Sequence, residues 1–400
     1  MSDKWGQSQI FQNENFNVAT HPGEKSDSDP ISLMAEGARQ MGICNSCRYC
    51  EGYCAVFPAM ERRLAFHATD LNYLANLCHN CGECYYACQY SPPHEFAINV
   101  PQLLGAIRAK SYRQYAWPAP LARLFDSNGL FVALALMFGI AGIFLLATLA
   151  AGSGAALFQA HRGGDFYAVI PHKAMAGAFG AVSLFVLAAL IAGFMNFWRD
   201  AGENLAEFVR PFALTEALKD IATLKNLDGD GSVGCTYPGE QPSQARRWFH
   251  HLSFYGFLLC FTATVVGTLY HYGFGWQAPY GFYSLPVLLG TLGGIGLVVG
   301  PAGLWWLKSR CDPATANPEQ SVMDIAFIAL LVLTSLTGLA LLALRESAWM
   351  GSLLIIHLGA VMALFISLPY GKFVHGIYRG AALVKYALER RRPGLNLGSD

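Results

Sequence analysis

Charged residues are scarce in this chain. Only 14% of its 400 residues are Asp, Glu, Lys or Arg, whereas 54% are hydrophobic and the mean hydropathy is +0.32. Soluble globular proteins carry about 25% charged residues, so the composition argues against an ordinary cytosolic globule. The 27 basic and 27 acidic residues leave no formal net charge, and the basic excess typical of nucleic-acid-binding proteins is missing.

The first residues also lack a signal peptide, because no basic segment leads into a short apolar run. Residues 1–30 are rich in Asn, Gln, Ser, Asp and Glu, and we expect a disordered tail there. Eight of the 11 cysteines fall between Cys44 and Cys88. With no leader these thiols are expected in the reducing cytoplasm, where clustered cysteines bind metal more often than they form disulfides.

Long apolar runs dominate the chain from residue 129 onward. A transmembrane helix needs about 20 predominantly apolar residues. Six segments qualify, at residues 129–151, 171–198, 250–272, 285–307, 322–344 and 349–369. No charged residue occurs between Arg247 and Lys308, a length that rarely stays uncharged in a soluble protein. The sequence therefore predicts a bundle of six transmembrane helices.

Basic residues gather on one side of these six segments. The opposite side has only Arg162, Lys173 and Arg345. The richer side holds Arg108, Lys110, Arg113, Arg123, Arg199, Arg246, Arg247, Lys308, Arg310, Lys385 and residues 390–392. The positive-inside rule then predicts that both termini and the cysteine-rich segment are cytoplasmic, in a multi-pass protein of the bacterial inner membrane.

The clustered cysteines form two identical runs. Cys44-x2-Cys47-x2-Cys50-x3-Cys54 recurs as Cys78-x2-Cys81-x2-Cys84-x3-Cys88. In bacterial ferredoxins with this spacing, three cysteines of a run hold one [4Fe–4S] cluster and the fourth binds the other. The expected ligands of cluster 1 are Cys44, Cys47, Cys50 and Cys88. Those of cluster 2 are Cys78, Cys81, Cys84 and Cys54.

Zinc and disulfides explain the cysteine pattern less well. A structural zinc site needs four ligands in two separated pairs, which this doubled register does not match. The pattern departs from the bacterial one because Ala55 and Gln89, rather than proline, follow the fourth cysteines. Such a proline directs the chain and does not bind iron, so the ligand assignment is kept. His79, beside Cys78, could tune a cluster by hydrogen bonding.

Two other segments resemble binding motifs but are interpreted differently. Acidic residues alternate within residues 228–235 as in a calcium loop, yet the Glu required at the twelfth position is missing. The glycines between Gly290 and Gly296 imitate a dinucleotide-binding loop, but they lie inside an apolar span. Small residues there allow close approach of two helices.

Histidines in or near the apolar segments are candidate haem ligands, since ligand-type side chains at membrane depth usually have a function. The candidates are His172, His250, His251, His271, His357 and His375. His357 and His375 are 18 residues apart, so in one helix they would share a face about 27 Å apart along the axis. That spacing suits two stacked haems, one near each membrane surface.

The helix that begins near residue 250 offers matching partners. His250 and His271 fall within about 60° of each other around a helix, whereas His251 and His271 are about 160° apart. We therefore expect two haem b sites, His250 with His375 on the cytoplasmic side and His271 with His357 on the far side. The alternative is that each histidine is satisfied separately in the headgroup region. Two histidines are reserve ligands, His251 and His172.

Several strings give the chain a family resemblance. The segment Leu368-Pro-Tyr-Gly-Lys-Phe-Val-His375 resembles the last haem-binding helix of the nitrate reductase gamma-subunit type of cytochrome b, and Pro369 can redirect a helix end. Further strings are Gly234-Cys-Thr-Tyr-Pro238, Arg246-Arg-Trp-Phe-His-His-Leu-Ser-Phe-Tyr-Gly256, Tyr270-His-Tyr272, Ser284-Leu-Pro286, Gly293-Gly-Ile-Gly296 and Gly300-Pro-Ala-Gly303. With the cysteine runs, they make residues 35–390 resemble the tricarballylate/citrate utilisation protein B family (TcuB or CitB).

The resemblance implies an inner-membrane electron carrier that reoxidises the flavin of a separate dehydrogenase. The residues indicate the same class, since no flavin or nicotinamide fingerprint opens a strand–turn–helix unit. We expect an FAD-dependent dehydrogenase for tricarballylate or a related tricarboxylate to dock on the cysteine-rich head. Electrons would pass through two [4Fe–4S] clusters and haem b to quinone, and this electron-transfer subunit would have no catalytic site for an organic substrate.

The expected fold is an all-α membrane protein with an N-terminal cytoplasmic helical bis-[4Fe–4S] ferredoxin-like domain. We divide the chain into a disordered tail (1–30), the ferredoxin-like domain (31–125), a six-helix cytochrome b-like domain (126–376) with a cytoplasmic loop (199–249), and a cytoplasmic basic tail (377–400).

Two alternative functions belong to other classes. A terminal reductase resembling heterodisulfide reductase would use a Cys-Cys motif, and the sequence has none; Cys235, Cys260 and Cys311 are isolated. A transporter or redox sensor would favour carboxylates at mid-membrane, whereas the spans carry only Asp324, near an end.

Overall fold

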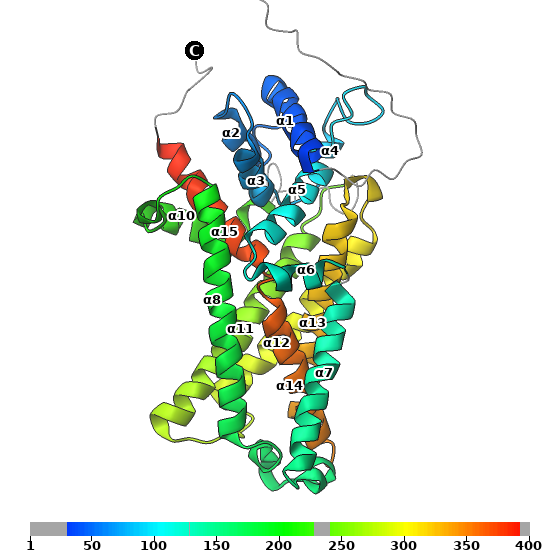
Figure 1. Ribbon diagram of the computed structural model, residues 1–400, viewed down its shortest axis with the longest axis vertical. Coiled ribbons are helices and arrows are strands. Elements are labelled where there is room, and N and C mark those ends of the chain that lie inside the picture. The colour runs from blue at the N-terminus through cyan, green and yellow to red at the C-terminus, as the bar shows by residue number, and fades with distance from the viewer. Residues whose placement is uncertain (1–29, 128, 228–240, 393–400) are drawn as a thin grey trace, which may run out of the picture.

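The computed structural model describes residues 30–127, 129–227 and 241–392. Helices account for the regular structure of these residues, and no strand occurs among them, so the predicted all-α fold is confirmed. Figure 1 shows a long bundle with a head of shorter helices at one end. The calcium-like segment, Cys235 and most of the expected N-terminal tail lie outside the described residues.

Six helices are long and apolar enough to cross a membrane, and they confirm the six predicted spans. They are α7 (Gly129–Ala150), α8 (His172–Asp200), α11 (Ala245–Phe274), α12 (Leu285–Ser309), α13 (Pro318–Ala343) and α14 (Met350–Ser367). Capping side chains and glycines mark the ends of these helices. The Asn317 side chain accepts a hydrogen bond from the Gln320 N–H at the start of α13, and Gly275 ends α11 with φ +70°.

The hairpin of α11 and α12 is held together by glycines. A Cβ atom on Gly256 would lie 2.9 Å from the carbonyl oxygen of Gly293, and one on Gly293 would lie 2.7 Å from Cys260 Sγ. Backbone therefore packs against backbone at this contact, as small residues permit. The interpretation of the Gly290–Gly296 segment as a helix-packing surface is borne out at Gly293 and Gly296.

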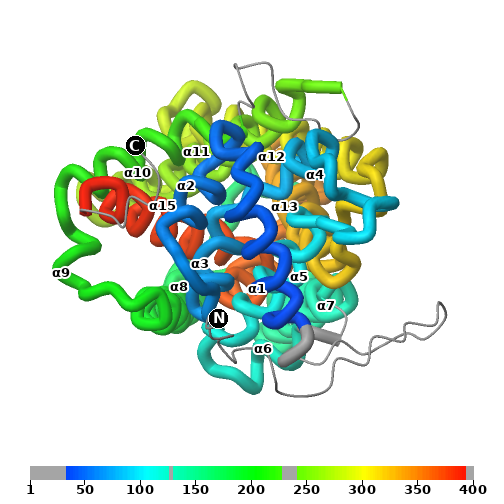
Figure 2. The backbone as a smooth tube through the Cα atoms, turned by 90° about the horizontal axis from the view of Figure 1, so that it is seen from above, coloured from blue at the N-terminus to red at the C-terminus, as the bar shows by residue number. Residues whose placement is uncertain are grey.

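The head is built from short helices stacked on one end of the bundle. They are α1 (Pro30–Cys47), α2 (Val56–Glu61), α3 (Ala68–Leu77), α4 (Glu83–Tyr86), α5 (Val100–Tyr115) and α6 (Ala119–Ser127). Seen from above, these helices cover the middle of the bundle (Figure 2). Residues 199–227 add α9 (Leu205–Phe208), α10 (Pro211–Thr223) and the 3-10 turn η4 (Lys225–Leu227).

The C-terminal segment differs from the expected basic tail. Residues 374–391 form the helix α15 (Val374–Arg391), whose Ala382 is 0% exposed and whose Leu388 is 3% exposed. This helix belongs to the same hydrophobic core as α3 and α10. The basic residues that indicated a tail, Arg390 and Arg391, lie only in its last turn. The apolar residues before them pack into the core of the head, so α15 completes that domain.

A break between α14 and α15 corrects a second expectation. Helix α14 ends at Ser367, and α15 starts only at Val374. Pro369 lies in the intervening turn and supplies no N–H to continue the helix. His357 and His375 therefore do not share one continuous helix face, and the separation expected for a single regular helix does not apply to them.

Candidate metal centres

The cysteines assigned to cluster 1 line one hollow in the head. Cys44 and Cys47 belong to the last turn of α1, Cys50 follows in the next turn of chain, and Cys88 comes from the segment after α4. The backbone N–H of Tyr90 lies 3.4 Å from Cys88 Sγ and donates to it. The structure thus brings together the three cysteines of the first run and the fourth cysteine of the second.

The cysteines assigned to cluster 2 line a second hollow. Its lining includes Cys54, Cys78, Cys81 and Cys84. The Asn80 N–H donates to Cys78 Sγ over 3.4 Å. Asn80 and Gly82 have positive φ, +54° and +82°, and these left-handed residues turn the chain around the hollow. The arrangement mirrors the first hollow, with the two runs exchanging their fourth cysteines.

Both hollows suit a polynuclear cluster. Among the residues that the structure describes, no three His, Cys, Asp or Glu side chains are close enough to share a single metal ion. In a [4Fe–4S] cluster each thiolate binds a different iron, so such closeness is not required. Burial and neighbouring thiols raise the pKa of Cys44 and that of Cys50 to about 12. Metal binding would therefore displace protons from these thiols.

Three arginines converge on the loop 78–80, which lines the second hollow. Arg108 of α5 donates to the Cys78 carbonyl and, over 3.2 Å, to that of Ala75. Arg379 of α15 donates to the same Cys78 carbonyl at 2.5 Å. Arg246 of α11 bonds the next two carbonyls of the loop at 2.7 and 2.8 Å. In the sequence, Arg108 and Arg246 stand out as orientation signals and Arg246 also begins a family-resemblance string, but no local motif links either of them to Arg379.

These arginines place positive charge beside the cysteines of cluster 2. Burial and the neighbouring Arg108 lower the pKa of Arg379 to about 10, which still leaves its guanidinium charged at neutral pH. Burial and the same arginines hold the pKa of His79 far below its ordinary value, so this ring is neutral. Positive charge and hydrogen bonds around a cluster raise its reduction potential.

The structure brings His250 and His375 together. Their ring centres are 6.1 Å apart, and the ring planes are 77° from parallel. The Nδ1 of His375 lies 2.6 Å from the Lys372 carbonyl oxygen, so Nδ1–H donates there and Nε2 keeps its lone pair. The Nδ1 of His250 is buried with no hydrogen-bond partner among the described residues. These two side chains fit a haem iron, since two imidazole ligands about 2 Å from one iron put their ring centres roughly 6 Å apart.

His271 and His357 are not brought together. The ring of His271 stacks instead on that of His172, with centres 3.9 Å apart and planes 20° from parallel. His357 Nδ1 lies 3.0 Å from the Thr337 hydroxyl of α13. Figure 1 shows α11 crossing the bundle at a tilt, so that its far end reaches the start of α8. This tilt and the break after α14 correct the expected far-side pair; the reserve residue His172 is the neighbour of His271.

The other reserve, His251, has aromatic neighbours rather than a stacked histidine among the described residues. Its ring packs near Trp248 and Tyr255, 6.2 and 5.7 Å away. His357, in contrast, has a fitted environment, because a Cβ atom on Gly338 would lie only 2.9 Å from His357 Cε1. Glycine at that position leaves room for the imidazole between α13 and α14.

A partly buried ion cluster lies beside the His250–His375 pair. Asp324 contacts Lys308 Nζ at 2.9 Å and Lys372 Nζ at 2.7 Å. Burial lowers the pKa of Lys372 to about 7, against the opposing effect of Asp324. In the sequence, Asp324 is recognisable only as a carboxylate near a span end. Its partners come from α12 and from the turn after α14, so only the fold reveals the cluster.

Comparisons with known proteins cover almost the whole chain. Residues 127–396 match a family model described as citrate utilization protein B. Residues 37–114, which contain both cysteine runs, match the Fer4-like domain of citrate utilization protein B. A curated Escherichia coli relative, citrate utilization protein B, is 53% identical over 358 residues, or 90% of this chain and 93% of the relative. No solved structure matches the chain. By family models and identity alike, this multi-pass membrane protein with a Fer4-like domain belongs to the citrate utilization protein B family.

Proposed function

We propose that this protein is an electron relay in the bacterial inner membrane, with its head and both termini in the cytoplasm. It would take electrons from the reduced FAD of a separate tricarballylate or related tricarboxylate dehydrogenase and deliver them to quinone. The family supports a role in citrate utilization, and the Fer4-like domain supports iron–sulfur chemistry.

A chain of contacts from the head into the membrane carries this proposal. The hollow of Cys44, Cys47, Cys50 and Cys88 is the outer one, beside Tyr49, which is 65% exposed. The second hollow includes His79, and Arg246 donates to the carbonyl of that residue. Arg246 lies one helical turn before His250 on α11, so one helix connects the second hollow with the His250–His375 pair.

The side chains have separate parts in this relay. When bound, clusters and haem supply one-electron chemistry, which converts the two-electron oxidation of a flavin into single transfers. The cysteines hold the two clusters in the head, and the loop 78–80 with its three arginines stabilises the added negative charge. His250 and His375 hold haem b at the boundary between head and bundle, with the Lys372 carbonyl fixing the tautomer of His375.

Within the part of the chain that the structure describes, the far end of the bundle offers no second pair of histidines at the spacing of two haem ligands. His172 and His271 are adjacent there, and His357 is enclosed deeper in the bundle beside Thr337. The ring centres of His172 and His271 are 3.9 Å apart and their planes are 20° from parallel, which is too close for two ligands of one haem iron. We therefore propose a single haem b, held by His250 and His375.

Cofactor content tests the proposal. Purified protein in detergent should show a sharp b-type α-band in its dithionite-reduced minus oxidised spectrum and about eight non-haem irons per chain. Replacing His375 with alanine should remove at least half of the haem measured as pyridine haemochrome while leaving non-haem iron unchanged. The matched control is His251→Ala, which should keep the full haem content. Clusters without any haem would refute the membrane half of the relay.

A further inference from the structure

A cavity lies at the boundary between the head and the bundle, outside both cysteine hollows. Its volume is about 310 Å³, within the range of small-molecule sites. Helices α7 and α13 and the turn after α14 provide the walls, which are mainly apolar and include Ala133, Ala326 and Leu330. The two alanines are 1% and 8% exposed, so the walls belong to the interior of the bundle.

The head-side end of the cavity is polar and aromatic. Arg113 and Glu319 form an ion pair of 3.1 Å there, with side chains 34% and 56% exposed. The ring of Phe125 stacks on that of Tyr370, with centres 5.5 Å apart. An apolar chamber with a charged mouth and a stacked aromatic pair matches a ligand that has a flat polar ring and an apolar tail.

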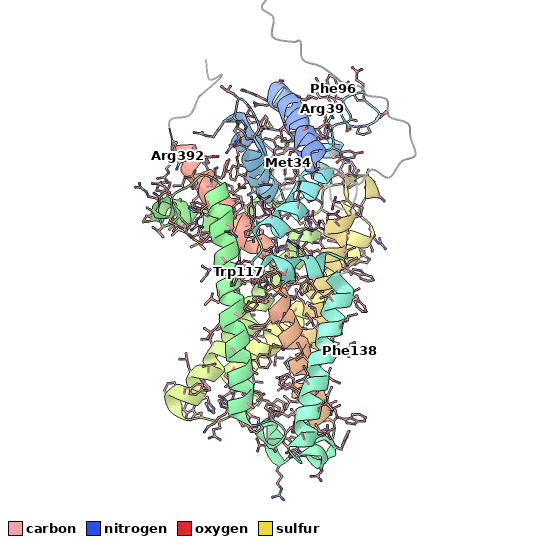
Figure 3. All side chains as sticks on the ribbon, viewed as in Figure 1. Met34, Arg39, Phe96, Trp117, Phe138 and Arg392 are labelled. Atoms are coloured by element: carbon pink, nitrogen blue, oxygen red, sulfur yellow. The ribbon has the colours of Figure 1, made fainter. Side chains whose placement is uncertain are left out.

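The cavity lies at the height along the bundle where we place the head-side membrane surface. The Tyr370 hydroxyl donates to the carbonyl of Trp117 over 3.1 Å. Figure 3 places Trp117 between the head and the long helices, well away from Phe138 on the shaft of α7. Tryptophan side chains are enriched at such interfaces. A ligand here would reach head-side water at its polar end and the hydrocarbon at its other end.

The wall of the cavity is also the segment that positions His375. Tyr370 and Gly371 line the cavity, and the next residue, Lys372, accepts the hydrogen bond from His375 Nδ1 at 2.6 Å. A second connection runs through aromatic rings. Phe327 in the wall lies 6.4 Å from Phe373, measured between ring centres, and Phe373 lies 5.5 Å from Phe257 of α11. The proposed haem site and the cavity therefore share one short stretch of chain.

We propose that this cavity binds the head group of a membrane quinone and is where this chain passes its electrons on. The inference rests on the proposed relay function and adds the site of its acceptor. One quinone takes up two electrons, supplied one at a time through this chain by the reduced dehydrogenase, and two protons, to give one quinol. The protons come from head-side water by way of the exposed Arg113–Glu319 mouth, and the quinone tail leaves past Val322, which is 46% exposed.

Photolabelling locates the quinone without measuring activity. Full-length protein in detergent is irradiated with an azido-quinone, digested, and its labelled peptides are identified by mass spectrometry. Label should fall within residues 113–133, 318–330 or 367–371 and should disappear in the presence of excess decylubiquinone. Label at the far end around His172 and His271 would overturn the location. Label in the cavity that decylubiquinone does not displace would mark a lipid-filled space and would overturn it as well.

A filled cavity gives an independent test. Val322→Trp puts a large side chain at the cavity edge, and Leu336→Trp on the same helix is the control, because Leu336 is 48% exposed and does not line the cavity. Dithionite-reduced protein is mixed with decylubiquinone, and reoxidation of its metal centres is followed by absorbance. We expect reoxidation at least tenfold slower in Val322→Trp and an unchanged rate in the control, with both variants keeping full haem and iron content.

The two ways of failing are distinguishable. If decylubiquinone reoxidises the wild-type protein and both variants equally fast, the location is wrong while the relay to quinone stands. If the wild-type protein holds clusters and haem but decylubiquinone does not reoxidise it, quinone is not the acceptor, and the proposed function fails together with this inference.

Discussion

At the scale of single residues, the charges around the loop 78–80 have the largest expected effect on the reduction potential of the proposed cluster 2. Two cysteine runs specify which thiols can bind iron, but the spacing says nothing about the electrostatic environment of a cluster. That environment comes from Arg108, Arg246 and Arg379, which belong to three helices and all donate to carbonyls of one loop. Each of these arginines places a guanidinium group against the loop that lines the second hollow.

Arg379→Gln should lower the reduction potential of cluster 2. Loss of one partly buried positive charge a few ångströms from the proposed cluster corresponds to roughly 50–100 mV at the effective dielectric of a protein. The measurement is an EPR-monitored redox titration of both clusters in the purified protein.

The control for this titration is Arg391→Gln on the same helix. Arg391 stacks over Phe212 in the exposed last turn of α15, away from the loop 78–80. Its cluster potentials should match those of the wild type. Equal potentials in Arg379→Gln and wild-type protein would contradict the electrostatic role of Arg379.

At the scale of elements, the α11–α12 hairpin and α15 carry the structure around the site. The hairpin joins through backbone contacts at Gly256, Gly293 and Gly300, and α11 begins with Arg246 and His250. Its tilt decides where the histidines at its two ends lie. Helix α15 carries both His375 and Arg379, so one helix positions a proposed haem ligand and a charge beside the proposed cluster 2.

Gly293→Val should loosen the hairpin. A Cβ atom at this position would stand 2.7 Å from Cys260 Sγ and 2.8 Å from its backbone nitrogen, so the helices must separate. Overpacking of this kind costs about 1–3 kcal/mol. The melting temperature of the detergent-solubilised protein should fall by several degrees. Gly290→Ala, whose added Cβ would meet Ala263 at an ordinary 3.7 Å, should melt like wild type; an equal fall in both variants would argue against a specific contact.

Ala382→Glu should disrupt the head. Ala382 is 0% exposed in the core that α15 shares with α3 and α10, and an unpaired carboxylate buried there costs several kcal/mol. We expect loss of most non-haem iron from the purified protein. Arg391→Glu puts the same side chain in the exposed last turn of α15 and should retain it. A fully loaded Ala382→Glu protein would mean that the C-terminal helix is dispensable for the clusters.

At the scale of the whole molecule, the head and the bundle form one packed unit. A single hydrophobic core contains residues of α3, α8, α10 and α15, so the ferredoxin-like part is continuous with the helices below it. Electrons from a docked dehydrogenase would therefore travel through a fixed path, with no need for the head to move.

Topology can be tested with fusions. Fluorescent protein fused after Asp400 should fluoresce, because the proposed C-terminus is cytoplasmic. Alkaline phosphatase inserted after Gly281, between α11 and α12, should be active, because that loop is proposed to lie on the far side. The reverse pattern would place the head outside the cytoplasm and would exclude docking of a cytoplasmic dehydrogenase.

The sequence by itself determined the class of the protein. Apolar length alone predicts the six spans, because crossing a membrane is a local requirement on about 20 residues. The cysteine runs predicted two sets of four thiols that the fold does bring together, because the ferredoxin turn is local chemistry and only the fourth ligand depends on a partner run. The pairing of His250 with His375 was also anticipated, since both flank the same membrane surface.

Only the tertiary structure decided the remaining contacts. The tilt of α11, set by glycine packing against α12, placed His271 beside His172 and away from His357. Pro369 ended α14 and freed α15 to enter the head as a core helix, where a charge pattern alone had indicated a tail. The three arginines at the loop 78–80 come from segments more than 100 positions apart in the sequence. The lining of the cavity beside Tyr370 also joins residues more than 100 positions apart. Such contacts depend on how whole helices pack, and no periodicity within one segment encodes that.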